Sequence, residues 1–270
     1  MGLESSNLSV SAKVKRIMNY KEYGTNNKEI IILIHGGGLS WWNYKEAALI
    51  LSSSYHIILP ILDGHASSDA PFTSIENNAK EIISFIDNNC SGKVLLIGGL
   101  SLGGQILLEM LSQRKDICKY SLIESASVHP SKFTNALIGP SFSLSYGLIK
   151  NKNFSKLQFK SLHIKENLFD DYYRGTCLIQ KSDMISFMKA STSYSLKDEI
   201  KNTDSFVYIF YGEKEVRSIK KSSKLINDKI KNSIITSIPK LYHGEFSINH
   251  PDIYVDTIQK IINEWYILFK

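Results

Sequence analysis

A serine between two glycines is the first pattern in this chain that could perform chemistry. The spacing is Gly99-x-Ser101-x-Gly103, with an unbroken apolar run before it and apolar residues at helical spacing after it. A strand that turns directly into a helix here forces the serine into strained backbone geometry and leaves no room for side chains on either side. The pattern predicts a nucleophile elbow at the carboxyl edge of a sheet. In the alternative interpretation, the serine only caps the helix.

An alcohol is a weak nucleophile at neutral pH, so Ser101 needs a base that accepts its proton. His243 is the strongest candidate, because it lies just after the last predicted strand and before the last predicted helix. His250 directly precedes that helix and is better explained as part of its entrance. His35 and His65 lie in glycine-rich loops, and we expect them to hold these loops by hydrogen bonds.

The histidine in turn needs an acid that orients it. Glu215 and Glu213 both follow the predicted strand at residues 206–211, and Glu215 is placed to reach across to His243. Glu124 ends the preceding predicted strand and is a second alternative, since an acid from that edge could also reach the histidine. The resulting chain order of serine, acid and histidine is the one expected after a nucleophile elbow.

Two backbone amides are candidate donors for the negative oxygen that develops during acyl transfer. The amide of Leu102 points into the site from the start of the predicted helix. Its partner should come from the loop after the strand at residues 30–34, where consecutive glycines let the backbone approach closely. Gly37 is the first choice and Gly38 the second.

Strand and helix patterns alternate along most of the chain, which predicts an α/β fold with a mostly parallel central sheet and helices on both faces. A leading antiparallel hairpin is expected at residues 10–24. The other expected strands are residues 30–34, 56–60, 94–97, 120–126, 206–211 and 234–238. Helices are expected at residues 41–52, 102–114, 219–230 and 251–265. Another helix is expected to begin at a capping box formed by Thr73 and Glu76 and to continue to residue 86.

One long region breaks this alternation. No convincing strand pattern occurs in residues 129–201, which are rich in aromatic residues and methionine. A stretch of this length does not remain structureless inside a folded domain. We therefore expect a mostly helical cap at residues 129–201, inserted between two parts of one α/β core at residues 1–128 and 202–270.

Composition and charge exclude several classes of function. The chain has 270 residues, 43% hydrophobic residues and a formal charge of +6, with its lysines scattered along the sequence. Neither a basic cluster interleaved with aromatics nor a run of about 18 apolar residues occurs, so we expect no nucleic-acid partner and no membrane partner. The three cysteines form no metal-ligand spacing and no disulfide framework. We expect a cytoplasmic protein, without a secretory signal, that needs neither metal nor organic cofactor.

Together these motifs resemble the α/β-hydrolase superfamily over essentially the whole chain, and its capped, esterase-like members in particular. The matching segments are residues 35–38, 60–69, 99–103, 211–215 and 242–244. The resemblance implies a catalytic triad of Ser101, His243 and Glu215. Two departures stand out: Glu215 replaces the usual aspartate, and Ile61 and Ala66 alter the loop at residues 60–69.

The sequence thus predicts a serine hydrolase that cleaves a carboxylic ester or related acyl compound through an acyl-enzyme, with a small-molecule acyl substrate. The same residues could instead serve acyl transfer, C–C bond hydrolysis or cofactor-free perhydrolysis. A catalytically inactive ligand-binding relative is a third possibility, because a fold does not dictate a function. The sequence leaves the oligomeric state open.

Overall fold

A seven-stranded sheet forms the centre of the part of the chain that the computed structural model describes, residues 18–268. Its strands are β1 (Tyr20–Tyr23), β2 (Ile30–Ile34), β3 (His56–Pro60), β4 (Val94–Leu100), β5 (Cys118–Glu124), β6 (Phe206–Gly212) and β7 (Ser233–Ile238). They lie in the order β1-β3-β2-β4-β5-β6-β7. Only β1 is antiparallel to its neighbour, β3, and every other pairing is parallel, so the predicted mostly parallel sheet is confirmed.

The strand β2 illustrates why these segments are unbroken apolar runs. Ile32 and Ile34 pack into a first hydrophobic cluster, whereas Ile31 and Leu33 pack into a second cluster on the opposite face. Successive side chains of a strand point to opposite faces, so a strand covered on both sides must be apolar at every position. The run of isoleucine and leucine in β2 therefore indicates burial between two layers of helices.

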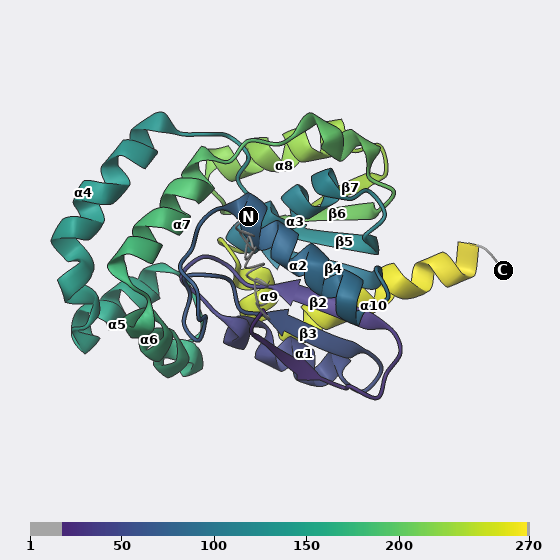
Figure 1. Ribbon diagram of the computed structural model, residues 1–270, viewed down its shortest axis with the longest axis horizontal. Helices are drawn as coiled ribbons and strands as arrows, with labels where there is room; N and C mark the ends of the chain where they lie inside the picture. Colours follow the sequence, from purple (N-terminus) through teal and green to yellow (C-terminus); the bar gives the residue numbers. More distant parts are fainter. Residues whose placement is uncertain (1–17, 269–270) are drawn as a thin grey trace, which may run out of the picture.

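Helices from both ends of the chain supply these layers (Figure 1). The helices α2 (Ile75–Asn89), α3 (Leu102–Gln113) and α8 (Arg217–Lys229) contribute Ile82, Leu107 and Ile226 to the first cluster. The second cluster receives side chains from the 3-10 helix η1 (Trp41–Tyr44), α1 (Lys45–Leu51), α9 (Glu245–Asn249) and α10 (Pro251–Leu268). The prediction of helices on both faces of the sheet is confirmed.

The region between β5 and β6 is helical. It comprises α4 (Lys132–Ile149), α5 (Lys152–Ser161), η2 (Glu166–Leu168), α6 (Phe169–Leu178), α7 (Lys181–Ser193) and η3 (Asp198–Asn202). In Figure 1, the helices α4 to α7 lie together at the left of the molecule, beside the sheet. They occupy the segment for which the sequence predicts an inserted cap, and the division into residues 1–128, 129–201 and 202–270 stays a prediction.

Three local expectations need correction or completion. The helix α2 is capped by Ser74, whose side chain accepts a hydrogen bond from the Asn77 amide at 3.1 Å, and not by Thr73. Thr73 instead accepts a bond from the Asn77 side chain. The second strand of the expected leading hairpin is β1, which pairs with β3, and the first hairpin strand falls mainly outside the described residues. The five-residue helix α9 was not predicted from the sequence.

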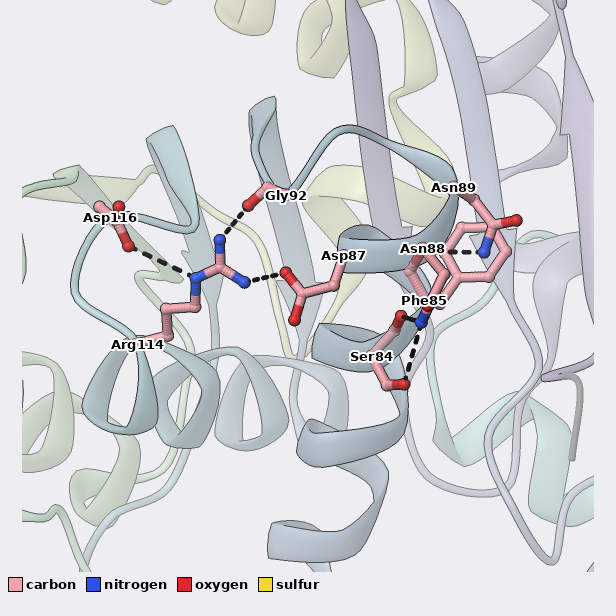
Figure 2. A network of polar contacts seen from close by, with 8 residues as sticks. All are labelled: Ser84, Phe85, Asp87, Asn88, Asn89, Gly92, Arg114 and Asp116. Atoms are coloured by element: carbon pink, nitrogen blue, oxygen red, sulfur yellow. Dashed lines mark hydrogen bonds and ion pairs between the residues drawn. The ribbon is translucent and has the colours of Figure 1, made fainter. Parts of the chain in front are cut away.

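A polar network joins the two helices that flank β4 (Figure 2). Arg114, directly after α3, donates to the Asp87 carboxylate on α2 and to the Gly92 carbonyl in the turn before β4. The same guanidinium lies 3.4 Å from a carboxylate oxygen of Asp116. A planar group with several donors can hold three segments at once. This network lies at the end of α3 opposite Ser101.

Candidate active site

The backbone at Ser101 has the geometry predicted for a nucleophile elbow. Ser101 lies between β4 and α3 with φ 53° and ψ −110°, a combination that costs free energy for any residue with a side chain. Two hydrogen bonds hold it: its amide donates to the Glu124 carbonyl at 2.8 Å, and its carbonyl accepts from the Gln105 amide at 3.0 Å. The sheet and the helix therefore fix the position of the serine from both sides.

The flanking glycines are required by close backbone contacts. A Cβ atom at Gly99 would lie 2.4 Å from the Gly103 carbonyl oxygen, and one at Gly103 would lie 2.1 Å from the Ile34 carbonyl oxygen. Both distances are far below any normal carbon–oxygen contact, so a side chain at either position would displace backbone. The G-x-S-x-G spacing is thus a steric consequence of the turn.

His243 and Glu215 meet across a distance of 28 residues in sequence. His243 lies in the loop after β7, and Glu215 lies in the loop after β6. The imidazole Nδ1 of His243 is 2.8 Å from Oε1 of Glu215. The Glu215 side chain is 2% exposed and that of His243 is 47% exposed. Because a carboxylate at Nδ1 favours the tautomer with its proton there, Nε2 remains as the nitrogen that can accept a proton.

The two alternative acids have other partners. Glu213 is exposed and accepts a hydrogen bond from the Lys240 amide at 2.9 Å, which ties it to the end of β7. Glu124 is 1% exposed, and its Oε1 lies 3.4 Å from the amide of Ser247 on α9. Among the described acids, only Glu215 hydrogen-bonds to His243. This geometry favours Glu215 over both alternatives.

Charges around the imidazole favour its protonated form. Burial lowers the pKa of His243, but the hydrogen bond to Glu215 and the negative charges of Glu215 and Glu124 outweigh it and raise that pKa above 6.5. Burial raises the pKa of the Glu124 carboxyl to about 7, against the lowering effects of Ser247 and His243. The charge on Glu215 raises it further. A second carboxyl group thus lies close enough to influence His243 electrostatically.

The two residues whose amides are the candidate oxyanion donors are neighbours in the fold. A Cβ atom at Gly37 would be 3.4 Å from a methyl carbon of Leu102, so the two residues are in contact range. Neither the Gly37 amide nor the Leu102 amide donates a hydrogen bond to any described residue. The amide of Gly38, in contrast, donates to His65 Nε2 at 3.0 Å. The donor of Gly38 is therefore occupied, which favours Gly37 as the partner of Leu102.

His35 and His65 hold the two loops of the site, as the sequence predicts. His35 Nε2 accepts from the Leu62 amide at 3.1 Å, just as His65 Nε2 accepts from Gly38. Each accepting Nε2 must be unprotonated, so each ring donates through Nδ1, to the carbonyls of Gly36 and Asp63. Burial lowers the pKa of His35 to about 3 and that of His65 to about 4, which keeps both rings neutral.

A cavity of about 290 Å³ joins the predicted residues. Ser101, His243, Glu215 and Gly37 all line it, although the serine hydroxyl makes no direct hydrogen bond to His243 in the described structure. Most of the remaining lining is apolar; it includes Leu39, Leu100, Leu162, Ile164, Val216 and Ile248. The cavity thus brings together the candidates that the sequence predicts for the nucleophile, the base, its acid and a backbone donor.

Part of the cavity wall was not predicted. Residues 161–164, between α5 and η2, line it, and the His163 ring stacks on Tyr242 with a centroid distance of 3.9 Å. Lys214 also contacts this ring, with its Nζ 4.7 Å from the Tyr242 ring centroid. No sequence pattern indicates these contacts, because they join segments about 80 residues apart that meet only in the folded chain.

Among residues 18–268, no group of three or more His, Cys, Asp or Glu side chains is arranged to hold a metal ion. None of the helices there combines the length and apolar character that crossing a membrane requires.

Comparison with known proteins gives one family and several relatives. The model of the alpha/beta hydrolase family matches residues 31–182. Lipase 1 from Psychrobacter immobilis is 28% identical over 160 residues, which make up 57% of this chain and 50% of that protein. The match thus spans about half the length of this curated relative.

Solved structures resemble the chain over nearly its whole length. An esterase from Exiguobacterium antarcticum has a TM-score of 0.77 at 16% identity, covering 91% of this chain and 95% of its own. A thermophilic esterase from Thermogutta terrifontis has a TM-score of 0.75 at 14% identity, covering 92% and 93%. At these identities the likeness establishes the fold alone.

Proposed function

Because the chain belongs to the alpha/beta hydrolase family, we propose that it is a serine hydrolase that cleaves carboxylic esters through an acyl-enzyme. The observation that best supports this proposal is the convergence of Ser101, His243 and Glu215 on one cavity, with the His243–Glu215 hydrogen bond at 2.8 Å. The relatives described as a lipase and as esterases agree with an ester substrate.

In the proposed reaction, Ser101 Oγ attacks the ester carbonyl carbon while His243 Nε2 accepts the serine proton. Glu215 keeps the other imidazole proton on Nδ1 and stabilises the imidazolium that forms. The amides of Gly37 and Leu102 donate to the carbonyl oxygen as it becomes negative, and Leu102 lies at the positive end of α3. His243 then protonates the departing alcohol, and later activates the water that cleaves the acyl-enzyme.

The helices between β5 and β6 act in this proposal as a cap that selects the substrate. Residues 161–164 of this region line the cavity, and its wall is mostly apolar. An apolar acyl group would bury its surface there, while the ester carbonyl lies between Ser101 and the two amides.

The decisive variant is Ser101→Ala. We expect kcat for a short p-nitrophenyl ester to fall by about 10⁴-fold or more, since the nucleophile cannot be replaced. A matched control is Ser91→Ala, because Ser91 has the same φ of 53° but lies in the turn before β4, away from the cavity. A fluorophosphonate should label the wild type at Ser101. Ester turnover that survives Ser101→Ala at the wild-type rate would refute the proposal.

A further inference from the structure

The helix α4 (Lys132–Ile149) carries large apolar side chains on both its inner and its outer side. Its inner side packs against the protein: Ile138 and Ile149 are buried, and Phe142 and Tyr146 contact the first core cluster. Its outer side exposes four large apolar side chains, namely Phe133 (78% exposed), Leu137 (48%), Leu144 (88%) and Leu148 (50%). Their spacing of four, seven and four residues places them in one stripe along the helix.

Such a stripe is unusual on a surface helix. Residues 133–149 contain no Asp, Glu, Lys or Arg. The helix α8, in comparison, exposes Arg217, Lys221, Lys224 and Asp228 on its solvent side. Beyond Lys132, the polar residues on the exposed surface of α4, Thr134, Ser141 and Ser143, are uncharged. An exposed stripe of large apolar side chains normally marks a site of interaction with protein or lipid. In Figure 1, α4 lies at the outer edge of the molecule, so no described element covers its outer side.

The charged residues in and next to this helix along the sequence all have one sign. From residue 125 to residue 165 the chain has no Asp or Glu, but it has six lysines: Lys132, Lys150, Lys152, Lys156, Lys160 and Lys165. Three of them form ion pairs with acids from other segments. The others, Lys132, Lys150 and Lys160, form no ion pair with any described residue. Two of these three lie at the ends of α4.

We propose that the outer face of α4, defined by Phe133, Leu137, Leu144 and Leu148 and flanked by Lys132 and Lys150, docks on an anionic lipid surface. The apolar side chains would enter the boundary between headgroups and acyl chains, and the lysines would contact lipid phosphates. This departs from the expectation of no membrane partner, which rested on the lack of a long apolar run. A helix that lies on a membrane needs one apolar face, not a spanning segment.

Charge favours lipid over a second copy of the chain. Two copies that packed their α4 faces together would bring four helix-end lysines near one another. The segment at residues 125–165 offers no acidic side chain to pair with them. The phosphates of an anionic lipid surface supply negative charge for these lysines. The same surface can cover the apolar stripe along the whole length of α4.

The test measures co-sedimentation of the full chain with vesicles. Wild-type protein should bind vesicles of equal parts phosphatidylcholine and phosphatidylglycerol, and bind about tenfold more weakly to phosphatidylcholine alone or at high salt. Leu144→Glu should weaken binding to the mixed vesicles by about tenfold or more. Leu49→Glu is the matched control, because Leu49 is a leucine of α1 that is 52% exposed; it should bind as the wild type does.

Hydrolysis of a small water-soluble ester by Leu144→Glu should equal that of the wild type, which shows that the variant folds. Ser101→Ala should still bind vesicles, so the failure of the catalytic proposal is separable from the failure of this one. Wild-type protein that stays in solution with the mixed vesicles would overturn the inference. So would equal effects of Leu144→Glu and Leu49→Glu, or a wild-type dimer that Leu144→Glu converts to monomer, since a second copy would then cover the face.

Discussion

At the scale of single residues, His243 interacts with two carboxyl groups of different character. Glu215 forms its hydrogen bond at Nδ1 and is 2% exposed. Glu124 is fully enclosed, bonds to the Ser247 amide and acts on the imidazole only through its charge. A carboxylate that bonds the ring can set its tautomer, whereas a more distant charge can only shift its pKa. We therefore expect the two acids to have distinguishable effects on the pH profile.

Glu215→Gln should lower both the rate and the pKa of His243. The base works only when unprotonated, so kcat/KM falls as the pH drops through the pKa of His243, which lies above 6.5. Removing the negative charge lowers this pKa, and the acid limb moves to lower pH. The plateau value of kcat/KM at high pH should drop on the order of 10⁴-fold, since the variant favours the wrong tautomer of His243. Glu213→Gln, at an exposed neighbour, should change neither quantity. If instead Glu124→Gln abolishes the plateau and Glu215→Gln leaves it intact, the acid is misassigned.

Glu124→Gln should change how stability depends on pH. The folded-state pKa of about 7 lies above the ordinary value of 4.5, so the stabilising contribution is complete below 4.5 and is lost as the pH rises through 7. Relative to the glutamine variant, the wild type should lose up to about 3 kcal/mol of unfolding free energy over this window. Urea unfolding of both proteins at pH 4.5 and pH 8 measures the difference. A constant difference at the two pH values would contradict the raised pKa.

At the scale of elements, two buried histidines hold the loops that follow β2 and β3. His65 accepts from the Gly38 amide at 3.0 Å, next to the proposed oxyanion donor Gly37. The ring of Phe187 on α7 stacks on His65 with a centroid distance of 4.4 Å. A Cβ atom at Gly37 would lie 3.5 Å from the Phe187 ring, so this helix of the region between β5 and β6 also packs against the loop that carries Gly37. The geometry of that loop depends on neutral His65 and on contact with α7.

His65→Ala should destabilise the fold and slow the reaction. The variant leaves the Gly38 amide without its acceptor, which costs about 1–3 kcal/mol, and lets the Gly37 loop shift. We expect a larger effect on kcat than on KM. Because the folded-state pKa of about 4 lies below 6.5, the contribution of His65 is present above pH 6.5 and is lost as the pH falls through 4. Thermal unfolding of the wild type and the variant at pH 8 and pH 5 measures how much stability His65 contributes and whether that contribution falls at the lower pH.

His56→Ala is the matched control for this variant. His56 begins β3 and pairs with Glu22 at 2.9 Å, at a partly exposed position. Its loss should cost less than about 1 kcal/mol and leave kcat unchanged. Equal losses in the two variants would show that the loop does not depend on His65.

At the scale of the whole molecule, the volume of the cavity limits the substrate. Its volume of about 290 Å³ lies at the lower end of the roughly 300–1,000 Å³ that ligand pockets usually have. The wall combines the sheet edge, the loops after β6 and β7, and residues 161–164 from the helical region. A long acyl chain would have to displace side chains from this close-packed wall.

We therefore expect kcat/KM for p-nitrophenyl butyrate to exceed that for the palmitate ester by about tenfold or more. Leu162→Ala should reduce this preference, because Leu162 lines the cavity after α5. Leu157→Ala, on α5 itself but outside the cavity, should not reduce it. A wild type that hydrolyses both esters equally well would contradict a closed wall.

Local patterns in the sequence were sufficient for the elements and for the elbow. The strand β4, the turn at Ser101 and the helix α3 are encoded by adjacent residues, and the close contacts of Gly99 and Gly103 explain why only glycine fits there. The N-cap of α2 was misplaced by one residue, because Thr73 and Ser74 both offer a hydroxyl and only backbone geometry distinguishes them. The short helix α9 was missed because five residues are too few to display a helical period.

The amino-acid sequence by itself determined the α/β alternation, the nucleophile elbow and a short set of candidate partners for Ser101, since all of these follow from residue types at near spacing. Only the tertiary structure decided that Glu215, and not Glu213 or Glu124, hydrogen-bonds to His243. It also decided that His65 occupies the amide of Gly38. These choices depend on which segments meet at the carboxyl edge of the sheet. The pairing of strands that are distant in sequence, such as Tyr120 of β5 with Phe206 of β6, decides which segments meet there.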